Sequence, residues 1–192
     1  MRIFSSLYER IMRWAGHRHA PGYLFGLSFA ESSFFPVPPD VMLAPMALAR
    51  PDRAWRYAAL TTVGSVLGGM LGYVVGLLAF DMVEPLLHAA GYWEKYQAAV
   101  RWFGVWGFWA IFLAGFSPIP YKVFTITAGV VAMSLLPFVI GSLIGRGARF
   151  FLVAALMVWG GERMERTLRR YIDRIGWLVI GAAALIYLIL RN

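Results

Sequence analysis

Two long apolar stretches of this chain are each interrupted by a proline-rich break that is flanked by charged residues. A straight helix does not run through such a break, because proline removes a backbone hydrogen bond and clashes with the preceding turn. An offset of 82 residues superimposes the two breaks, placing Pro36, Pro38 and Asp40 on Pro118, Pro120 and Lys122. Hydrophobic segments interrupted at corresponding places in two halves of a chain are typical of transporter binding sites.

The composition predicts an integral membrane protein. Of the 192 residues, 60% are hydrophobic and 15% are charged, against about 25% charged residues in soluble domains. The length allows one membrane domain and no sizeable soluble one. Cysteine is absent, which excludes disulfides, thiolate metal sites and a cysteine nucleophile. We attribute the net charge of +8 to cytoplasmic loops rather than to nucleic-acid binding.

The hydrophobic pattern predicts an all-α integral membrane fold with two re-entrant helical hairpins. The first hairpin has half-helices at 22–35 and 39–49, broken at Pro36, Pro38 and Pro39. The second covers 103–133 and is broken at Pro118 and Pro120. The other expected elements are an amphipathic interfacial helix at 1–20, an interfacial helix at 81–101, and three transmembrane helices at 57–80, 135–160 and 175–190. The segment 1–20 has no cleavage site typical of a signal peptide.

A second match extends the internal repeat beyond the breaks. Gly64-Ser65 and Gly68 align with Gly141-Ser142 and Gly145 at an offset of 77. Small residues four apart line one helix face and allow another backbone to approach closely. We therefore expect a membrane domain at 21–160 that is built of two repeats, followed at 161–192 by a basic cytoplasmic loop and a C-terminal transmembrane helix.

The distribution of Lys and Arg predicts the topology. Segments 1–20, 50–56 and 161–174 contain four, three and five basic residues, whereas 81–101 contains two basic and three acidic residues. Basic residues concentrate in cytoplasmic loops. The three basic segments share the cytoplasmic face only if both hairpins are re-entrant and open from opposite sides. The sequence therefore predicts inverted hairpins in the inner (plasma) membrane, with a cytoplasmic N-terminus.

Charged residues at membrane depth are the candidate site residues, because each needs a partner or water there. They are Glu31, Asp40, Lys122, Arg146 and Arg149. One interpretation is a polar site at the midplane, and the alternative is a set of internal salt bridges that fix the hairpins. Arg149 shares a helix face with Gly141 and Gly145, whereas Arg146 lies off that face and could snorkel. We therefore favour Arg149 for function.

The residue types suggest a role for each candidate. Intramembrane carboxylates form proton relays, so Glu31 and Asp40 are the expected proton carriers. Asp40 and Lys122 lie in the first turns of the second half-helices, and helix N-termini favour a phosphate or carboxylate. The expected anion site consists of Lys122, Arg149, Ser117 as a helix cap, and Tyr121. The histidines have no ligand spacing, so we expect no metal and no cofactor.

The chain resembles the DedA family, also called the VTT or SNARE-associated domain, over roughly residues 20–160. The first shared motif is Glu31, Pro36-Val-Pro38-Pro39 and Asp40, and the second is Phe116-Ser-Pro118, Lys122, Ala128-Gly129 and Met133. The amino-acid sequences at both breaks resemble those of the YqaA-type branch of this family. Two departures stand out, because family members have arginines where this chain has Gly115 and Tyr121. Arg149 is the residue expected to supply the missing charge.

The resemblance implies an inner-membrane transporter-like protein with two re-entrant hairpins, linked to protons and to phospholipid or polyprenyl phosphate movement. The leading hypothesis is a proton-coupled transporter, or a lipid flippase or scramblase, for an anionic phosphate-bearing lipid or small molecule. The first alternative is a non-transporting membrane scaffold or assembly factor with structural salt bridges. A membrane-embedded enzyme is disfavoured, since the chain shows no nucleophile–base pair or P-loop. Expected partners are lipids and protons, with a homo-oligomer left open and nucleic acid excluded.

Overall fold

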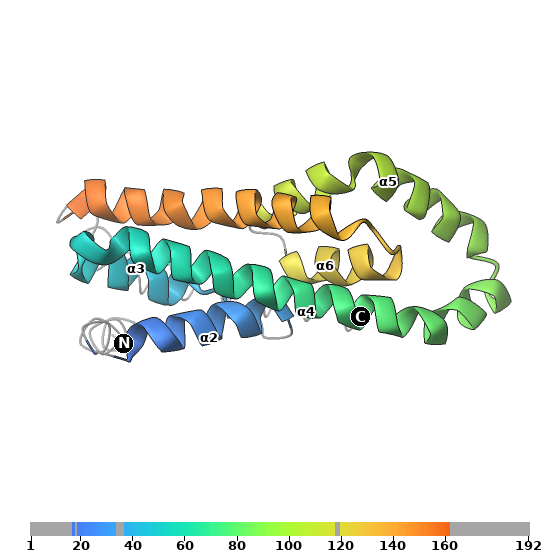
Figure 1. Cartoon of the computed structure of the whole chain (residues 1–192), viewed down its shortest axis with the longest axis horizontal. Helices are drawn as coiled ribbons and strands as arrows, with labels where there is room; N and C mark the ends of the chain where they lie inside the picture. Colours follow the sequence, from blue (N-terminus) through green and yellow to red (C-terminus); the bar gives the residue numbers. More distant parts are fainter. Residues whose placement is uncertain (1–16, 18, 34–36, 118–119, 162–192) are drawn as a thin grey trace, which may run out of the picture.

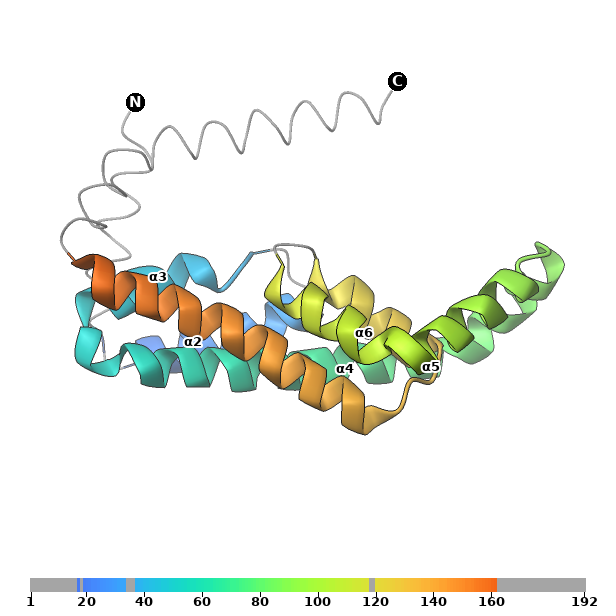
Figure 2. The ribbon, with the colours of Figure 1, turned by 90° about the horizontal axis from the view of Figure 1, so that it is seen from above.

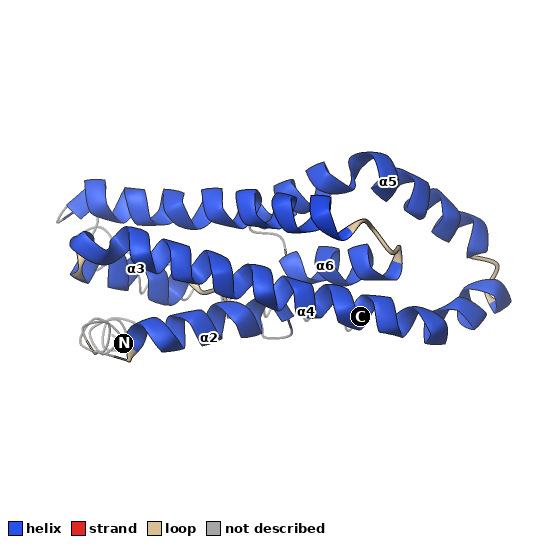
Figure 3. Ribbon diagram, viewed as in Figure 1, coloured by secondary structure: helices blue, strands red, loops and turns tan. Residues whose placement is uncertain are grey.

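The computed structural model describes residues 17, 19–33, 37–117 and 120–161. Within these residues every regular element is helical and none is a strand (Figure 3). The elements are α2 (Ala20–Ser33), α3 (Asp40–Ala49), the short 3-10 helix η1 (Pro51–Arg53), α4 (Ala54–Ala89), α5 (Trp93–Phe116), α6 (Tyr121–Val130) and a last helix, Leu135–Gly161. The expectation of an all-α fold is therefore confirmed for the described part of the chain.

Three of the described helices are long and apolar enough to cross a membrane, namely Pro51–Met82, Trp93–Phe116 and Leu135–Gly161. α4 has 36 residues and therefore a length of about 54 Å at 1.5 Å per residue. The hydrocarbon core of a bilayer is about 30 Å thick. We therefore expect the C-terminal turns of α4, which contain Asp81 and Glu84, to extend beyond it.

Two broken helix pairs lie along the long helices and point toward each other. α2 and α3 run in opposite directions beside one half of α4, and α6 lies beside the other half (Figures 1 and 2). The ends at Ser33 and Asp40 face the ends at Phe116 and Tyr121 near the middle of the molecule (Figure 2). The predicted half-helices at 22–35 and 39–49 agree with α2 and α3 to within two residues.

Glycines bring the first arm of each broken pair into backbone contact with a long helix. A β-carbon added at Gly68 of α4 would lie 2.2 Å from the carbonyl oxygen of Phe29 in α2. A β-carbon at Gly145 would likewise lie 2.4 Å from the carbonyl oxygen of Phe112 in α5. Any larger residue would push the helices apart, so the two glycine motifs perform the same packing task 77 residues apart.

The second arm of the second pair packs equally closely. β-Carbons added at Gly76 of α4 and at Gly129 of α6 would lie 2.1 Å and 2.0 Å from the carbonyl oxygens of Ile126 and Tyr73. α6 is thereby fixed against α4 by its backbone. α3 contacts the C-terminal half of the last helix through side chains instead, with Leu43 and Met46 in one buried cluster with Phe150.

The prediction of a separate interfacial helix at 81–101 is wrong. α4 continues without a break to Ala89, and α5 begins at Trp93. Gly91, with φ of +70°, forms the turn between them, a backbone conformation that glycine adopts without steric cost. The polar segment is therefore divided between two long helices that continue past the apolar part.

Several predictions fall outside the described residues. These are the amphipathic helix at 1–20 except for its last residues, the basic loop from 162, the span at 175–190, and the two break prolines Pro36 and Pro118. Pro38, Pro39 and Pro120 are described, and they immediately precede α3 and α6. Proline is well tolerated at a helix start, where its missing N–H would have no intrahelical partner.

Candidate binding site at the helix breaks

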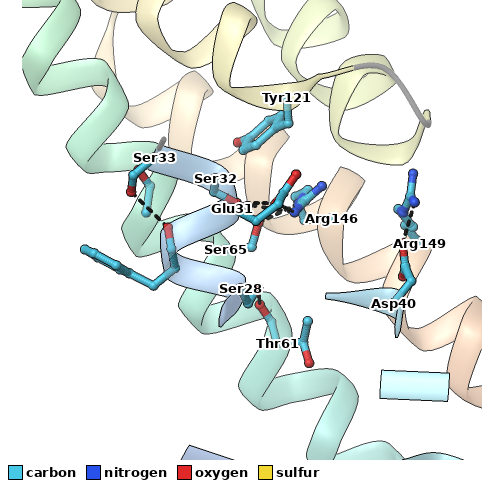
Figure 4. A network of polar contacts seen from close by, with 12 residues as sticks. Ser28, Glu31, Ser32, Ser33, Asp40, Thr61, Ser65, Tyr121, Arg146 and Arg149 are labelled. Atoms are coloured by element: carbon cyan, nitrogen blue, oxygen red, sulfur yellow. Dashed lines mark hydrogen bonds and ion pairs between the residues drawn. The ribbon is translucent and has the colours of Figure 1, made fainter. Parts of the chain in front are cut away.

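Arg146 of the last helix forms a buried ion pair with Glu31 in the last turn of α2 (Figure 4). Its side chain is 3% exposed, and that of Glu31 is 15% exposed. The same guanidinium donates to the hydroxyls of Ser65 in α4 and Ser32 in α2, which themselves lie 2.7 Å apart. The pair thus joins α2, α4 and the last helix through one charged group.

Two aromatic rings contact the guanidinium group of this arginine. The guanidinium carbon of Arg146 lies 4.9 Å from the centre of the Tyr121 ring and 4.7 Å from that of Phe150. Tyr121 is fully buried, and its hydroxyl donates to Ser142 at 2.5 Å. Ser142 in turn donates to the carbonyl of Phe138 at 2.7 Å. Arg146 is therefore stabilised in a buried position by both cation–π contacts and charge-assisted hydrogen bonds.

A second ion pair joins Arg149 of the last helix to Asp40, the first residue of α3. The nitrogen Nη2 of Arg149 lies 2.5 Å from Oδ2 of Asp40, and Nη1 donates to the carbonyl of Ser117 at 2.8 Å. The side chains of Arg149 and Asp40 are 21% and 22% exposed, respectively. Within the described part of the chain, Asp40 Oδ1 and Arg149 Nε are buried atoms without a hydrogen-bond partner. This pair is more open and less completely bonded than Arg146 with Glu31.

Arg146, which the helix-face argument allowed to snorkel, is instead the more deeply buried of the two arginines. The internal repeat of the sequence does indicate that Arg146 points inward. The offset of 77 places Gly69 and Gly72 of α4 on Arg146 and Arg149. Both glycines face α6, because β-carbons there would lie 3.0 Å from the Tyr121 ring and 2.5 Å from Thr125 Oγ1. The whole repeat, rather than the glycine face alone, indicates that both arginines point inward.

Ser117 and Tyr121 both lie at the site, and their part in anion binding stays a prediction. Ser117 ends α5 and contributes its carbonyl to Arg149. The residue before α6 is Pro120, and no side chain caps that helix, so the predicted capping by Ser117 is wrong. Tyr121 supports Arg146 from α6. Among the predicted site residues, the structure thus brings Glu31, Asp40, Ser117, Tyr121 and Arg149 together with Arg146.

Lys122 is the second residue of α6, next to Tyr121, and it is partly buried. Its carbonyl accepts a hydrogen bond from Thr125 at 3.0 Å. The repeat pairs Lys122 with Asp40 as equivalent positions, but the basic partner that the structure assigns to Asp40 is Arg149. A role for Lys122 in anion binding stays a prediction.

The two departures from the family pattern both contact Arg146. A β-carbon at Gly115 would lie 3.2 Å from the Arg146 backbone nitrogen and 3.4 Å from its Cγ, and Tyr121 stacks on its guanidinium. Small and aromatic residues at these positions leave room for a basic side chain from the last helix. Arg146 and Arg149 therefore bring two positive charges to the breaks from the last helix. The resemblance implies arginines at positions 115 and 121 instead.

Other candidate features lie apart from this site. A cavity of about 330 Å³ opens between α5 and the turn before the last helix, with Phe103, Phe108 and Met133 in its walls. None of the charged site residues lines it. Among the described residues, no three of the histidine, aspartate and glutamate side chains come together as a metal site would require.

Comparison with known proteins identifies the family to which this chain belongs. The chain is 48% identical over its full length to an uncharacterized protein of Haemophilus influenzae and 46% identical over its full length to one of Histophilus somni; in both cases the whole of the relative is covered. It is 32% identical over 92 residues, 45% of each chain, to undecaprenyl phosphate transporter A of Staphylococcus aureus. No solved structure matches. Residues 35–159 match the VTT domain, and the chain therefore belongs to the VTT domain family, the DedA family of membrane proteins.

Proposed function

We propose that this membrane protein is a transporter, flippase or scramblase that moves an anionic, phosphate-bearing lipid across the inner membrane and couples this movement to protons. The observation that carries the proposal is the meeting of Glu31, Asp40, Arg146 and Arg149 where the two broken helix pairs face each other. The residues 21–160 would form the transporting unit, with two re-entrant hairpins of opposite direction.

The relatives support the transport class. The family is membrane-embedded, and the Staphylococcus aureus relative is named for transport of undecaprenyl phosphate. That match covers less than half of either chain, so a polyprenyl phosphate is the substrate class that we propose by similarity. A phospholipid with a phosphate headgroup presents the same negative charge to an arginine.

The paired charges explain how such a site works. Each acid neutralises an arginine, which lowers the cost of keeping charge inside the membrane. A phosphate offers the same oxygen acceptors as a carboxylate, and arginine binds both with two parallel hydrogen bonds. When the acid takes up a proton and the arginine binds a phosphate, the ion pair between them is broken. The proton then neutralises the acid, and the phosphate neutralises the arginine. This exchange links proton movement to substrate binding.

The proposal is tested with purified protein in proteoliposomes that contain a fluorescent short-chain polyprenyl phosphate. A membrane-impermeant quencher added outside reports how fast the lipid changes leaflet. We expect wild-type protein to accelerate the exchange and an imposed pH gradient to alter its rate. Asp40→Asn should abolish the effect of the gradient, whereas Arg101→Gln, at an exposed position of α5, should leave it unchanged. Exchange no faster than in protein-free vesicles would exclude this function.

A membrane scaffold or assembly factor is the second candidate. It is favoured by the closure of both ion pairs in the structure and by the deep burial of Arg146. A purely structural site predicts that loss of the acids removes the protein from the membrane. Normal levels of Asp40→Asn protein together with lost exchange would instead support transport.

A further inference from the structure

The cavity of about 330 Å³ between α5 and the turn before the last helix lies away from the charged pairs. Small-molecule pockets begin at about this volume, 300 Å³. Apolar side chains from both elements form much of its wall, namely Val100, Phe103, Val105, Phe108, Val131 and Met133. Ser134 in the turn also lines the cavity and adds a hydroxyl group. The cavity therefore suits an amphipathic ligand with an apolar chain and a polar group.

A glycine keeps this cavity open. Gly104 lines it together with Val100 and Phe108, and residues four apart share one face of a helix. A β-carbon added at Gly104 would meet no atom within 4 Å, whereas one added at Gly107 would lie 2.9 Å from Met133 Sδ. The α5 backbone thus contacts Met133 closely at Gly107 and leaves open space at Gly104. A larger side chain at position 104 would therefore extend into the cavity without moving the helices.

The cavity lies at the edge of the hydrocarbon core when the helix breaks are placed at the bilayer middle, where the broken helices of transporters meet. Phe103 and Phe108 precede Phe116, the last residue of α5, by 13 and 8 residues, which is about 20 Å and 12 Å along the helix. Half of the hydrocarbon core is about 15 Å thick. The last helix gives the same level, because Ser134 precedes Arg146 by 12 residues, or about 18 Å.

Two exposed tryptophans of α5 support this depth independently. Trp102 and Trp106 are each about half exposed, and they lie about 21 Å and 15 Å along the helix from Phe116. Tryptophan is enriched at the membrane–water boundary, where its ring lies at the level of the headgroups. The neighbourhood of the cavity is therefore the zone in which acyl chains end and polar groups of the lipid begin.

We propose that this cavity binds one ester-linked acyl chain of a membrane glycerolipid, from the leaflet opposite to the segment 50–56. The chain lies against Phe103, Phe108 and Met133, and the hydroxyl of Ser134 donates to the ester carbonyl at the edge of the hydrocarbon core. Both ends of the cavity then match a lipid that stays in its own leaflet. This site is distinct from the one under the proposed function, because it requires no phosphate and none of the charged site residues lines it.

Lipid binding to the full-length protein in dodecyl maltoside tests the apolar part of the site. Native mass spectrometry counts bound dioleoyl phosphatidylcholine as its concentration rises. Gly104→Leu should weaken the tightest binding about tenfold, the effect of excluding roughly two methylene groups. Gly26→Leu in α2 is the matched control, because a β-carbon there also meets no atom within 4 Å, and it should bind as wild type. Unchanged binding by Gly104→Leu, or an equal loss in Gly26→Leu, would overturn the proposal.

A second comparison tests the polar end with the wild-type chain. A phosphatidylcholine with ether-linked chains keeps the chains and the headgroup but lacks the ester carbonyl. Wild-type protein should prefer the ester lipid about fivefold, the effect of one hydrogen bond, and Ser134→Ala should bind both lipids equally. Equal affinity of the wild type for both lipids, or a preference that survives in Ser134→Ala, would overturn the contact with the ester. Tighter binding of free oleic acid than of phosphatidylcholine would overturn the assignment to a glycerolipid.

These measurements involve no movement of lipid between leaflets. Loss of the binding site would therefore leave the transport proposal intact. Absence of lipid exchange in proteoliposomes, in turn, would leave this binding site intact.

Discussion

Gly69 and Arg146 occupy equivalent positions of the two long helices, 77 residues apart, and both contact Tyr121. A β-carbon at Gly69 would lie 3.0 Å from Tyr121 Cε1, and the Arg146 guanidinium carbon lies 4.9 Å from the centre of the same ring. The ring is thus close both to the backbone of α4 and to a positive charge from the last helix. At this position α4 has a glycine, which leaves room for the ring, and the last helix has an arginine, which carries a positive charge.

The first prediction concerns Tyr121. Tyr121→Phe removes the hydrogen bond to Ser142 but keeps the ring over Arg146, which should cost about 1 kcal/mol. Tyr121→Leu also removes the cation–π contact, worth up to about 2 kcal/mol when desolvated. The melting temperature in detergent should therefore fall in the order wild type, Phe, Leu. Equal melting of the Phe and Leu variants would show that the ring does not stabilise Arg146.

The second prediction compares the two acids. Glu31→Gln leaves Arg146 buried without its counter-ion, which typically costs about 3–5 kcal/mol. Asp40→Asn should cost less, because Asp40 and Arg149 are about one fifth exposed and solvent screens part of the loss. Thermal unfolding of both variants in the same detergent measures the difference. A larger loss for Asp40→Asn would contradict the view that the more deeply buried pair, Glu31–Arg146, contributes more to stability.

The third prediction concerns the glycine contacts. Gly68→Ala places a β-carbon 2.2 Å from the carbonyl oxygen of Phe29, and such overpacking costs about 1–3 kcal/mol. The matched control is Gly104→Ala in α5, where no atom lies within 4 Å of the added carbon. That control should be neutral or stabilising by up to about 1 kcal/mol, because alanine favours helix. Similar melting temperatures for both variants would refute the packing argument.

The fourth prediction concerns topology. The segment 50–56 and the turn at 90–92 lie at opposite ends of α4, and the positive-inside rule places the first in the cytoplasm. The chain has no cysteine, so single cysteines report position without background. An impermeant maleimide added to intact cells should label Ala90→Cys and not Asp52→Cys, and both should react after permeabilisation. Labelling at position 52 alone would reverse the proposed orientation.

The sequence by itself determined the membrane class, the positions of the helix breaks and the existence of the long helices at 57–80 and 135–160. These features depend on local chemistry: proline ends a helix wherever it stands, and a long apolar run forms a helix in a membrane whatever surrounds it. The half-helices of the first hairpin and the helix at 135–160 therefore agree with the structure to within about two residues, whereas the first arm of the second hairpin, expected from 103, begins at Trp93. The segment 81–101 was misassigned, because polarity indicates an exit from the membrane but does not by itself end a helix.

Only the tertiary structure decided which charges meet. Glu31 and Arg146 are 115 residues apart in the chain, and Asp40 and Arg149 are 109 apart. Their pairing depends on how three helices approach one another, which close contacts at Gly64, Gly68 and Gly145 control. Side-chain periodicity placed Arg146 off the inward face, but the packed helices bury it in contact with Tyr121 and Phe150. A charge far along the chain becomes a partner only when backbone packing brings it within hydrogen-bonding distance.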